Sequence, residues 1–231
     1  MKQKPDIRVI IPAFNEENAV GKVINEIPMD IVKEVIVVNN GSVDKTALEA
    51  KKAGATVLDQ PEKGYGRACL KGIDYLKSCD NTDIVVFLDA DYSDYPEETY
   101  QLVAPIINED VDMVIGSRAT GDRQSGSMTP QQIFGNWLAT KMIRWFYNEH
   151  FTDLGPFRAI KYQKLLDLDM QDKTYGWTVE MQVKAAKQKF KSTEIPVKYR
   201  QRIGVSKVSG TVKGTVMAGY KIITTILKYA V

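Results

Sequence analysis

Five short apolar runs, each separated from the next by a segment with helical spacing, occupy the first half of this 231-residue chain. Strands that alternate with helices in this way form a mostly parallel sheet with helices on its faces. We therefore predict an α/β fold whose first half is Rossmann-like. The predicted strands cover residues 8–11, 35–38, 56–58, 84–88 and 113–115, and the predicted helices cover residues 15–26, 44–53, 66–77 and 96–107.

The alternation stops after residue 118. Residues 120–128 form a Gly- and Ser-containing segment that we interpret as a functional loop, and residues 131–147 and 177–189 have helical spacing. A chain of this length, with 44% hydrophobic residues, can bury one substantial core but hardly two. We expect a single domain over residues 1–231.

The composition excludes several classes of protein. The 31 basic and 29 acidic residues nearly balance, so nothing favours a nucleic-acid binder held by bulk charge. His150 is the only histidine, which disfavours a Ser-His-Asp triad or a multi-histidine zinc site. Two cysteines, no apolar signal core near Met1 and no long uncharged apolar stretch lead us to expect a cytoplasmic protein.

Two aspartates, Asp89 and Asp91, follow directly on the apolar run 84–88 and are separated by Ala90. They should lie at the carboxyl end of a buried strand, the edge where open α/β sheets bind ligands. Two hard oxygen donors at this edge suit Mg²⁺ or Mn²⁺ held together with nucleotide phosphates. The alternative is a polar turn after a strand.

Polar groups also follow the other predicted strands, and all of these segments should meet at the same edge of the sheet. Side chains there can hydrogen-bond a base and ribose, while backbone N–H groups and two cations can face phosphate. A turn with a helix cap is the structural alternative. The candidates are Pro12, Ala13, Asn15, Glu16, Asn40, Asp44, Lys63, Gly64 and Arg67. A nicotinamide cofactor is disfavoured, because Cys69 stands where a dinucleotide fingerprint beginning at Gly64 would need its third glycine.

The ordered series of motifs resembles the family 2 glycosyltransferases, particularly the dolichyl-phosphate mannosyltransferase-like and polyprenyl-phosphate glycosyltransferase-like enzymes. The resemblance extends from about Arg8 to Lys207. It is carried by residues 10–16, 39–46, 64–72, the Asp89-Ala90-Asp91 triplet, and residues 116–118, 153–158, 176–180 and 200–207.

This resemblance implies a GT-A fold and a metal-dependent, inverting transfer of a sugar from a nucleotide-diphosphate sugar to a polyprenyl phosphate. It implies a nucleotide-sugar-binding half at about 7–118, an acceptor side with a phosphate loop at 119–208 and a C-terminal helix at 209–231. Asp89 and Asp91 would hold Mg²⁺ or Mn²⁺, and Arg202 and Lys207 would bind the phosphates. The residues expected to act catalytically are Asp91, Asp153, Arg202 and Lys207.

Two departures from the family pattern limit what the resemblance implies. Asn39 and Asn40 stand where relatives carry at least one aspartate, so the choice between guanine and uracil stays open. Ser93 stands where relatives often carry glutamine, so we expect no metal ligand at that position.

The C-terminal segment bears on the acceptor. Residues 212–229 form an amphipathic helix with apolar residues at three- or four-residue spacing and with Lys213, Lys221 and Lys228 on one side. The helix could lie on an anionic membrane, as a peripheral contact, or dock its apolar face on the catalytic domain.

A lipid phosphate is already anionic and would need no general base. A hydroxyl acceptor would need one, and Asp153, ahead of Glu180, is then the candidate. The alternatives are therefore the same donor chemistry with a soluble or polysaccharide hydroxyl acceptor, or a non-catalytic nucleotide-sugar-binding module. The sugar and the oligomeric state stay open.

Overall fold

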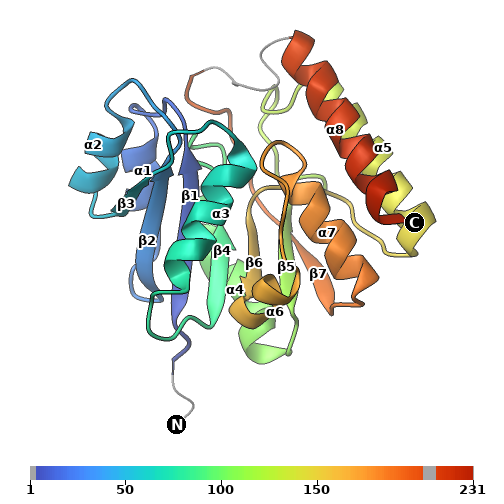
Figure 1. Cartoon of the computed structure of the whole chain (residues 1–231), viewed down its shortest axis with the longest axis horizontal. Helices are drawn as coiled ribbons and strands as arrows, with labels where there is room; N and C mark the ends of the chain where they lie inside the picture. The colour runs from blue at the N-terminus through green and yellow to red at the C-terminus, as the bar shows by residue number, and fades with distance from the viewer. Residues whose placement is uncertain (1–3, 205–211, 231) are drawn as a thin grey trace.

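The computed structural model describes residues 4–204 and 212–230, with side chains in the last segment described from residue 217. Within these ranges seven strands form one sheet in the order β3-β2-β1-β4-β6-β5-β7 (Figure 1). The strands are β1 (Ile7–Ala13), β2 (Val32–Asn39), β3 (Thr56–Asp59), β4 (Ile84–Phe87), β5 (Met113–Ser117), β6 (Arg158–Lys161) and β7 (Ser192–Pro196). The helices are α1 (Val20–Asn25), α2 (Thr46–Lys52), α3 (Tyr65–Leu76), the 3₁₀ helix η1 (Pro96–Glu98), α4 (Thr99–Asn108), α5 (Pro130–Tyr147), α6 (Tyr162–Asp167), α7 (Trp177–Lys187) and α8 (Val212–Ala230).

The predicted α/β architecture with a mostly parallel sheet is confirmed. β6 alone among these strands runs antiparallel, and it pairs with both β4 and β5. Three elements, β6, β7 and α6, were not predicted from the sequence. It also placed the start of α1 too early, because residues 15–19 form a turn in which Asn15 adopts a φ of 53°.

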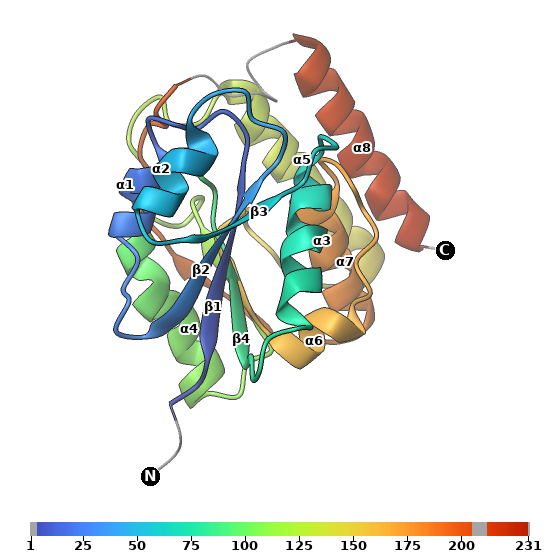
Figure 2. The same ribbon diagram turned by 60° about the vertical axis from the view of Figure 1, so that its left-hand side comes forward.

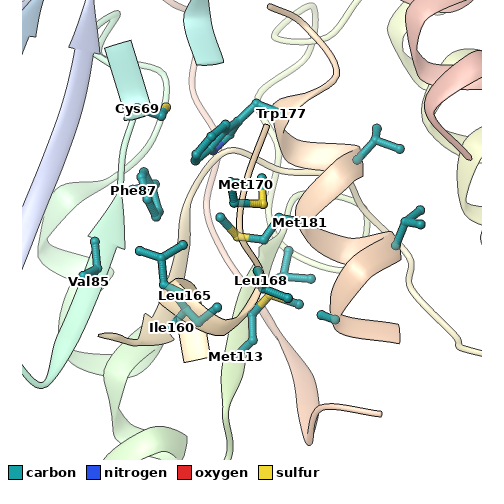
Figure 3. Close-up of a cluster of buried hydrophobic side chains, with 14 of the residues drawn as sticks. Cys69, Val85, Phe87, Met113, Ile160, Leu165, Leu168, Met170, Trp177 and Met181 are labelled. Carbon is teal, nitrogen blue, oxygen red and sulfur yellow. The ribbon is translucent and has the colours of Figure 1, made fainter. Parts of the chain in front are cut away.

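The alternating residues of the central strands build two cores, one on each face of the sheet. In β1, Ile10 faces the layer that contains α3, α5, α6 and α7, whereas Val9 and Ile11 face the layer of α1, α2 and α4 (Figures 1 and 2). Figure 3 shows the first core, where the rings of Phe87 and Trp177 meet edge to face at 5.9 Å. The sheet is therefore buried on both faces, which fixes the positions of its strand ends.

Helix α8 packs against α5 and α7 (Figure 1). Ile226 is fully buried, the Tyr147 hydroxyl donates to the Ile226 carbonyl at 2.7 Å, and the Tyr229 hydroxyl donates to Glu180 at 2.8 Å. Of the two alternatives for the C-terminal helix, the docked one is observed. In the part of the chain that the structure describes, no helix is both long enough and apolar enough to cross a bilayer.

Candidate active site

A cavity of about 250 Å³ opens at the carboxyl ends of β1, β2 and β4. The topology brings these three strand ends together, because β1 lies between β2 and β4 in the sheet. Most of the residues predicted to bind the nucleotide sugar meet here. Those lining the cavity are Pro12, Ala13, Glu16, Asn40, Lys63, Gly64, Asp89, Ala90, Asp91 and Arg202.

A second cavity of about 320 Å³ adjoins the first, and α5, α8 and the segment around Pro156 line it. The two cavities share Tyr65, Asp89, Asp91, Tyr175 and Arg202 in their walls. The two carboxylates therefore lie where the cavities meet. A molecule in one cavity and a molecule in the other would face each other across them.

Asp91 is held rigidly between a turn and an arginine. Its Oδ1 accepts a hydrogen bond from the Ser93 backbone N–H at 2.9 Å and another from the Ser93 hydroxyl. Its Oδ2 lies 3.0 Å from Arg202 Nη1, and Arg202 Nη2 lies 3.1 Å from Glu16 Oε1. Arg202 thus bridges two buried carboxylates, placing positive charge beside Asp91.

The ionised form of Asp89 is disfavoured by its surroundings. Its Oδ1 accepts a hydrogen bond from the Tyr65 hydroxyl at 3.0 Å. Burial and the negative charge of Asp91 raise the pKa of Asp89 to about 6. Two carboxylates that resist simultaneous ionisation form a good site for a divalent cation, whose charge relieves their repulsion.

The residues present fit Mg²⁺ or Mn²⁺ as part of a shared site. Among the described residues no group of three or more His, Cys, Asp or Glu is arranged to hold a metal. Asp89 and Asp91 would therefore supply only part of a coordination shell, and phosphate oxygens and water would complete it.

Asp94 lies behind this pair and is almost fully buried. Neither of its carboxyl oxygens has a hydrogen-bond partner in the described part of the chain. Burial, followed by the charges of Asp89 and Asp91, raises the pKa of Asp94 well above its ordinary value. Burial and the two neighbouring carboxylates therefore both oppose ionisation of Asp94.

The Asn40 side chain forms hydrogen bonds with the loop after β3. Its Nδ2 donates to the carbonyls of Gln60 and Glu62 at 3.1 and 2.7 Å, and its Oδ1 accepts from the Gly64 N–H at 2.7 Å. The amide is needed because a carboxylate could not donate to two carbonyls. Although Asn40 lines the first cavity, these loop contacts use its polar atoms.

The start of α3 does not offer the free N–H groups that we predicted for phosphate. The N–H groups of Gly66 and Arg67 donate to the carbonyls of Thr174 and Lys173, both at 3.2 Å. A Cβ at Gly66 would lie 1.9 Å from the Asp172 carbonyl oxygen, so only glycine fits there. Gly66 therefore allows two loops to approach closely, and the N–H groups of Gly66 and Arg67 are used in that contact, whereas Lys63 and Gly64 line the first cavity.

Three of the predicted nucleotide contacts do not line the first cavity: Asn15, Asp44 and Arg67. Asn15 Oδ1 accepts from the Val43 N–H at 2.9 Å, and Asp44 accepts from the N–H groups of Thr46 and Glu17. Arg67 pairs with Glu62 at 2.6 Å. These side chains hold the loops around the cavity. Lys207, the remaining predicted phosphate contact, lies outside the described residues.

Both carboxylates that were considered as a general base already accept hydrogen bonds from other groups of the protein. Asp153 is buried and accepts three hydrogen bonds from Arg118, from its N–H, Nε and Nη2, at 2.7 to 2.8 Å. Glu180 is also buried and accepts from the N–H groups of Gln171 and Asp172. Neither lines either cavity. The geometry therefore contradicts the prediction that Asp153 faces the acceptor, because Arg118 takes both of its oxygens.

Several residues that line the cavities were not predicted from the sequence. Tyr65 and Tyr175 line both cavities, and Arg118 and Tyr199 line the second, where the Arg118 guanidinium lies 5.1 Å from the Tyr199 ring centre. Tyr65 and Tyr175 each stand next to a glycine of a quoted motif, which was the available signal.

Comparison with known proteins agrees with this arrangement. The profile of the family described as "Glycosyl transferase family 2" matches residues 8–168, which is more than half of the chain. An uncharacterized glycosyltransferase of Mycobacterium tuberculosis is 32% identical over 214 residues, covering 92% of this chain and 94% of the relative. A dolichyl-phosphate hexose transferase of Haloferax volcanii is 30% identical over 207 residues, covering 88% of this chain and 86% of the relative.

Among solved structures, glucosyl-3-phosphoglycerate synthase of Mycobacterium tuberculosis, in complex with Mn²⁺, uridine diphosphate and phosphoglyceric acid, matches with a TM-score of 0.77. The match covers 98% of this chain and 78% of that chain at 22% identity. The predicted GT-A fold is thereby confirmed. The family profile covers β1 from Arg8 onward, all of β2 to β6, and the carboxylate pair. This chain therefore belongs to the family 2 glycosyltransferases.

Proposed function

We propose that this enzyme transfers a sugar, with inversion, from a nucleotide-diphosphate sugar to a polyprenyl phosphate, in a reaction that depends on Mg²⁺ or Mn²⁺. The observation that carries the proposal is the junction of two cavities at Asp89 and Asp91. One cavity lies at the strand ends where α/β folds bind nucleotides, and the other lies under α5 and α8.

The donor side has groups for a diphosphate. Lys63 and Arg202 line the first cavity together with the carboxylate pair. A divalent ion bound there would neutralise negative charge on the departing nucleoside diphosphate. Arg202 would bind the same phosphates through charge-assisted hydrogen bonds once they draw it away from Asp91.

The acceptor side favours an acceptor that arrives already ionised. Asp89 and Asp91 are the carboxylates among the described residues that line the second cavity, and both are assigned to the donor side. A phosphate oxygen carries its own charge near neutral pH, so positioning and charge neutralisation suffice for its attack on the anomeric carbon. Relatives named for dolichyl phosphate support this choice of acceptor.

A soluble acceptor is the second candidate. Glucosyl-3-phosphoglycerate synthase, which shares the fold along nearly the whole chain, was solved with phosphoglyceric acid. An acceptor of that kind would use the same donor side and would reach the second cavity from water.

The test is a transfer assay with a panel of labelled nucleotide sugars, a polyprenyl phosphate and Mg²⁺ or Mn²⁺, followed by separation of the organic and aqueous phases. We expect label in the organic phase and its loss with EDTA. Asp91→Asn should reduce turnover by about 10²- to 10³-fold, because the variant would weaken binding of the divalent ion that neutralises charge on the leaving group.

Asp74→Asn, at an exposed carboxylate on α3, is the matched control and should leave turnover unchanged. Metal-dependent consumption of donor without organic label would replace the lipid acceptor with a soluble one. Full turnover in Asp91→Asn would contradict the metal role of the carboxylate pair.

A further inference from the structure

Helix α5 presents a stripe of large apolar side chains to solvent. Phe134 is 61% exposed, Trp137 53% and Trp145 82%. Phe134 and Trp137 contact each other with ring centres 5.8 Å apart. At about 100° per residue, the stripe formed by Ile133, Phe134, Trp137 and Trp145 spans about 120° of the helix surface, opposite the buried Ile143. Exposed aromatic residues gathered on one face mark an interaction site.

Both charged residues of α5 are basic. Lys141 and Arg144 are exposed and lie within the same arc as the aromatic side chains. Neither α5 nor α8 contains an Asp or Glu, although the chain has 29 acidic residues. The two helices lie side by side (Figures 1 and 2), so neither contributes an acidic residue to the surface that they share.

The same helix also forms a wall of the second cavity. Gln131, Gln132, Gly135 and Asn136 line it from α5, and Ala218, Gly219 and Ile222 line it from α8. Phe134 and Trp137 lie on the same turns of α5 as this cavity wall but on the opposite side of the helix. A surface that binds the stripe would therefore be separated from the second cavity by the width of α5.

We infer that the exposed face of α5, formed by Phe134, Trp137, Lys141, Arg144 and Trp145, docks the enzyme on an anionic lipid bilayer. This inference rests on the proposed lipid-phosphate acceptor. Tryptophan and phenylalanine partition into the headgroup region, and each nearby cation adds attraction to anionic lipid. The docking surface is thus on α5, whereas the apolar face of α8 is used to hold α8 on the domain.

A second copy of the chain fits this face less well. In a symmetric dimer the stripe would pack against itself, which would bring Lys141 and Arg144 close to their own counterparts. With no carboxylate on α5 or α8, neither helix would compensate the repulsion. An anionic membrane supplies the missing negative charge.

The first test is flotation of the full-length protein with phosphatidylcholine vesicles, with and without phosphatidylglycerol. We expect binding that requires phosphatidylglycerol and decreases with salt. The charge reversal Lys141→Glu with Arg144→Glu should weaken binding by at least about tenfold. Lys51→Glu with Lys71→Glu, at exposed lysines on α2 and α3, is the matched control and should bind like the wild type. Equal loss in the two double variants would overturn the inference.

The second test uses the three tryptophans, since Trp137 and Trp145 lie on the stripe and Trp177 is buried. Vesicles containing brominated phospholipid should quench the fluorescence of the wild type. The Trp137→Phe, Trp145→Phe variant keeps the aromatic stripe but emits only from Trp177, and it should bind without quenching. Binding of the wild type without quenching would exclude α5 as the docking face, and concentration-dependent dimerisation without vesicle binding would assign the face to a second copy.

The docking surface and the proposed acceptor can be tested independently, because a different result would contradict each of them. Transfer to polyprenyl phosphate in detergent, without vesicle binding, would overturn the docking surface and leave the acceptor in place. Vesicle binding through α5, without transfer to any lipid phosphate, would support the docking surface and remove the proposed acceptor.

Discussion

Both polar atoms of the Asn40 side chain form hydrogen bonds: Nδ2 donates to two backbone carbonyls, and Oδ1 accepts from the Gly64 N–H. Asn40→Asp would place a carboxylate against the carbonyls of Gln60 and Glu62. We expect the variant to lose about 1–3 kcal/mol of stability, since two carbonyls lose their donor and face a negative charge. It should also bind donor more weakly, because this loop carries Lys63 into the cavity.

Urea unfolding and donor titration measure the two effects. Asn108→Asp, at an exposed asparagine at the end of α4, is the control and should change neither by much. If the Asn40→Asp variant is as stable as the wild type but prefers a different nucleobase, the role of Asn40 is to recognise the base and not to stabilise the loop.

Asp89 gives the metal-free protein a pH dependence of known sign. Its pKa in the folded protein is about 6, above the ordinary 3.8, so the folded state holds the proton more tightly. This contribution to stability is complete below pH 3.8 and disappears as the pH rises through 6. With EDTA present, Asp89→Asn should therefore be more stable than the wild type above pH 6, by on the order of 1–3 kcal/mol, and the difference should vanish toward pH 4.

Saturating Mn²⁺ should reverse that order, because only the wild type has both carboxylates to bind it. Thermal unfolding at several pH values, with EDTA or with Mn²⁺, checks both statements. An Asp89→Asn variant that is less stable than the wild type in EDTA at pH 7.5 would contradict the assigned cost of ionising Asp89.

At the level of elements, the sequence predicted the strands whose burial follows from their own apolar residues. β1, β2, β4 and β5 are covered on both faces and read as continuous apolar runs. β6 lacks that signal, since its Arg158 is buried only because the carbonyls of Leu154, Gly155 and Thr178 receive its guanidinium. A buried arginine of this kind depends on distant backbone, which no local pattern reveals.

The segment after β5 is joined to the segment before β6 by the Arg118–Asp153 pair. Burial opposes ionisation of Asp153, but Arg118 outweighs it and holds the pKa of Asp153 below its ordinary value. Asp153→Asn leaves the buried Arg118 with a neutral partner, so we expect a loss of about 3 kcal/mol in stability. The shape of the pH–rate profile should not change, because Arg118 occupies both oxygens of Asp153 and Asp153 lines neither cavity.

Urea unfolding and kcat measured across the pH range test this prediction. The control is Asp112→Asn at the opposite end of β5, where the carboxylate pairs with Lys161 at 3.1 Å. That variant should lose stability without a change in kcat. Loss of a limb of the pH–rate profile in Asp153→Asn alone would restore Asp153 as a general base.

For the whole molecule, the first cavity was predictable from the sequence and the second was not. Strand ends must converge at one edge of a parallel sheet, so Asp89, Asp91, Asn40 and Lys63 could be placed together from the order of the motifs. Arg202 was added by its resemblance to a family motif. The second cavity depends on how α5 and α8 pack, and Arg118, Tyr175 and Tyr199 reach it through loops whose paths are set by tertiary contacts.

A substitution at Gly219 on α8 can distinguish the functions of the two cavities. It lines the second cavity but not the first, and a Cβ at this position would have no atom within 4 Å. Gly219→Leu should therefore be accommodated by the fold while its side chain occupies the space under α8. We expect the KM for the acceptor to rise by about tenfold or more, with the KM for the donor unchanged, because only the acceptor needs that volume. Ala230→Leu, at an exposed position on the same helix, adds a comparable bulk outside the cavity and should leave both constants unchanged. If Gly219→Leu raised the donor KM instead, the second cavity would belong to the donor, and the assignment of α5 and α8 to the acceptor side would be wrong.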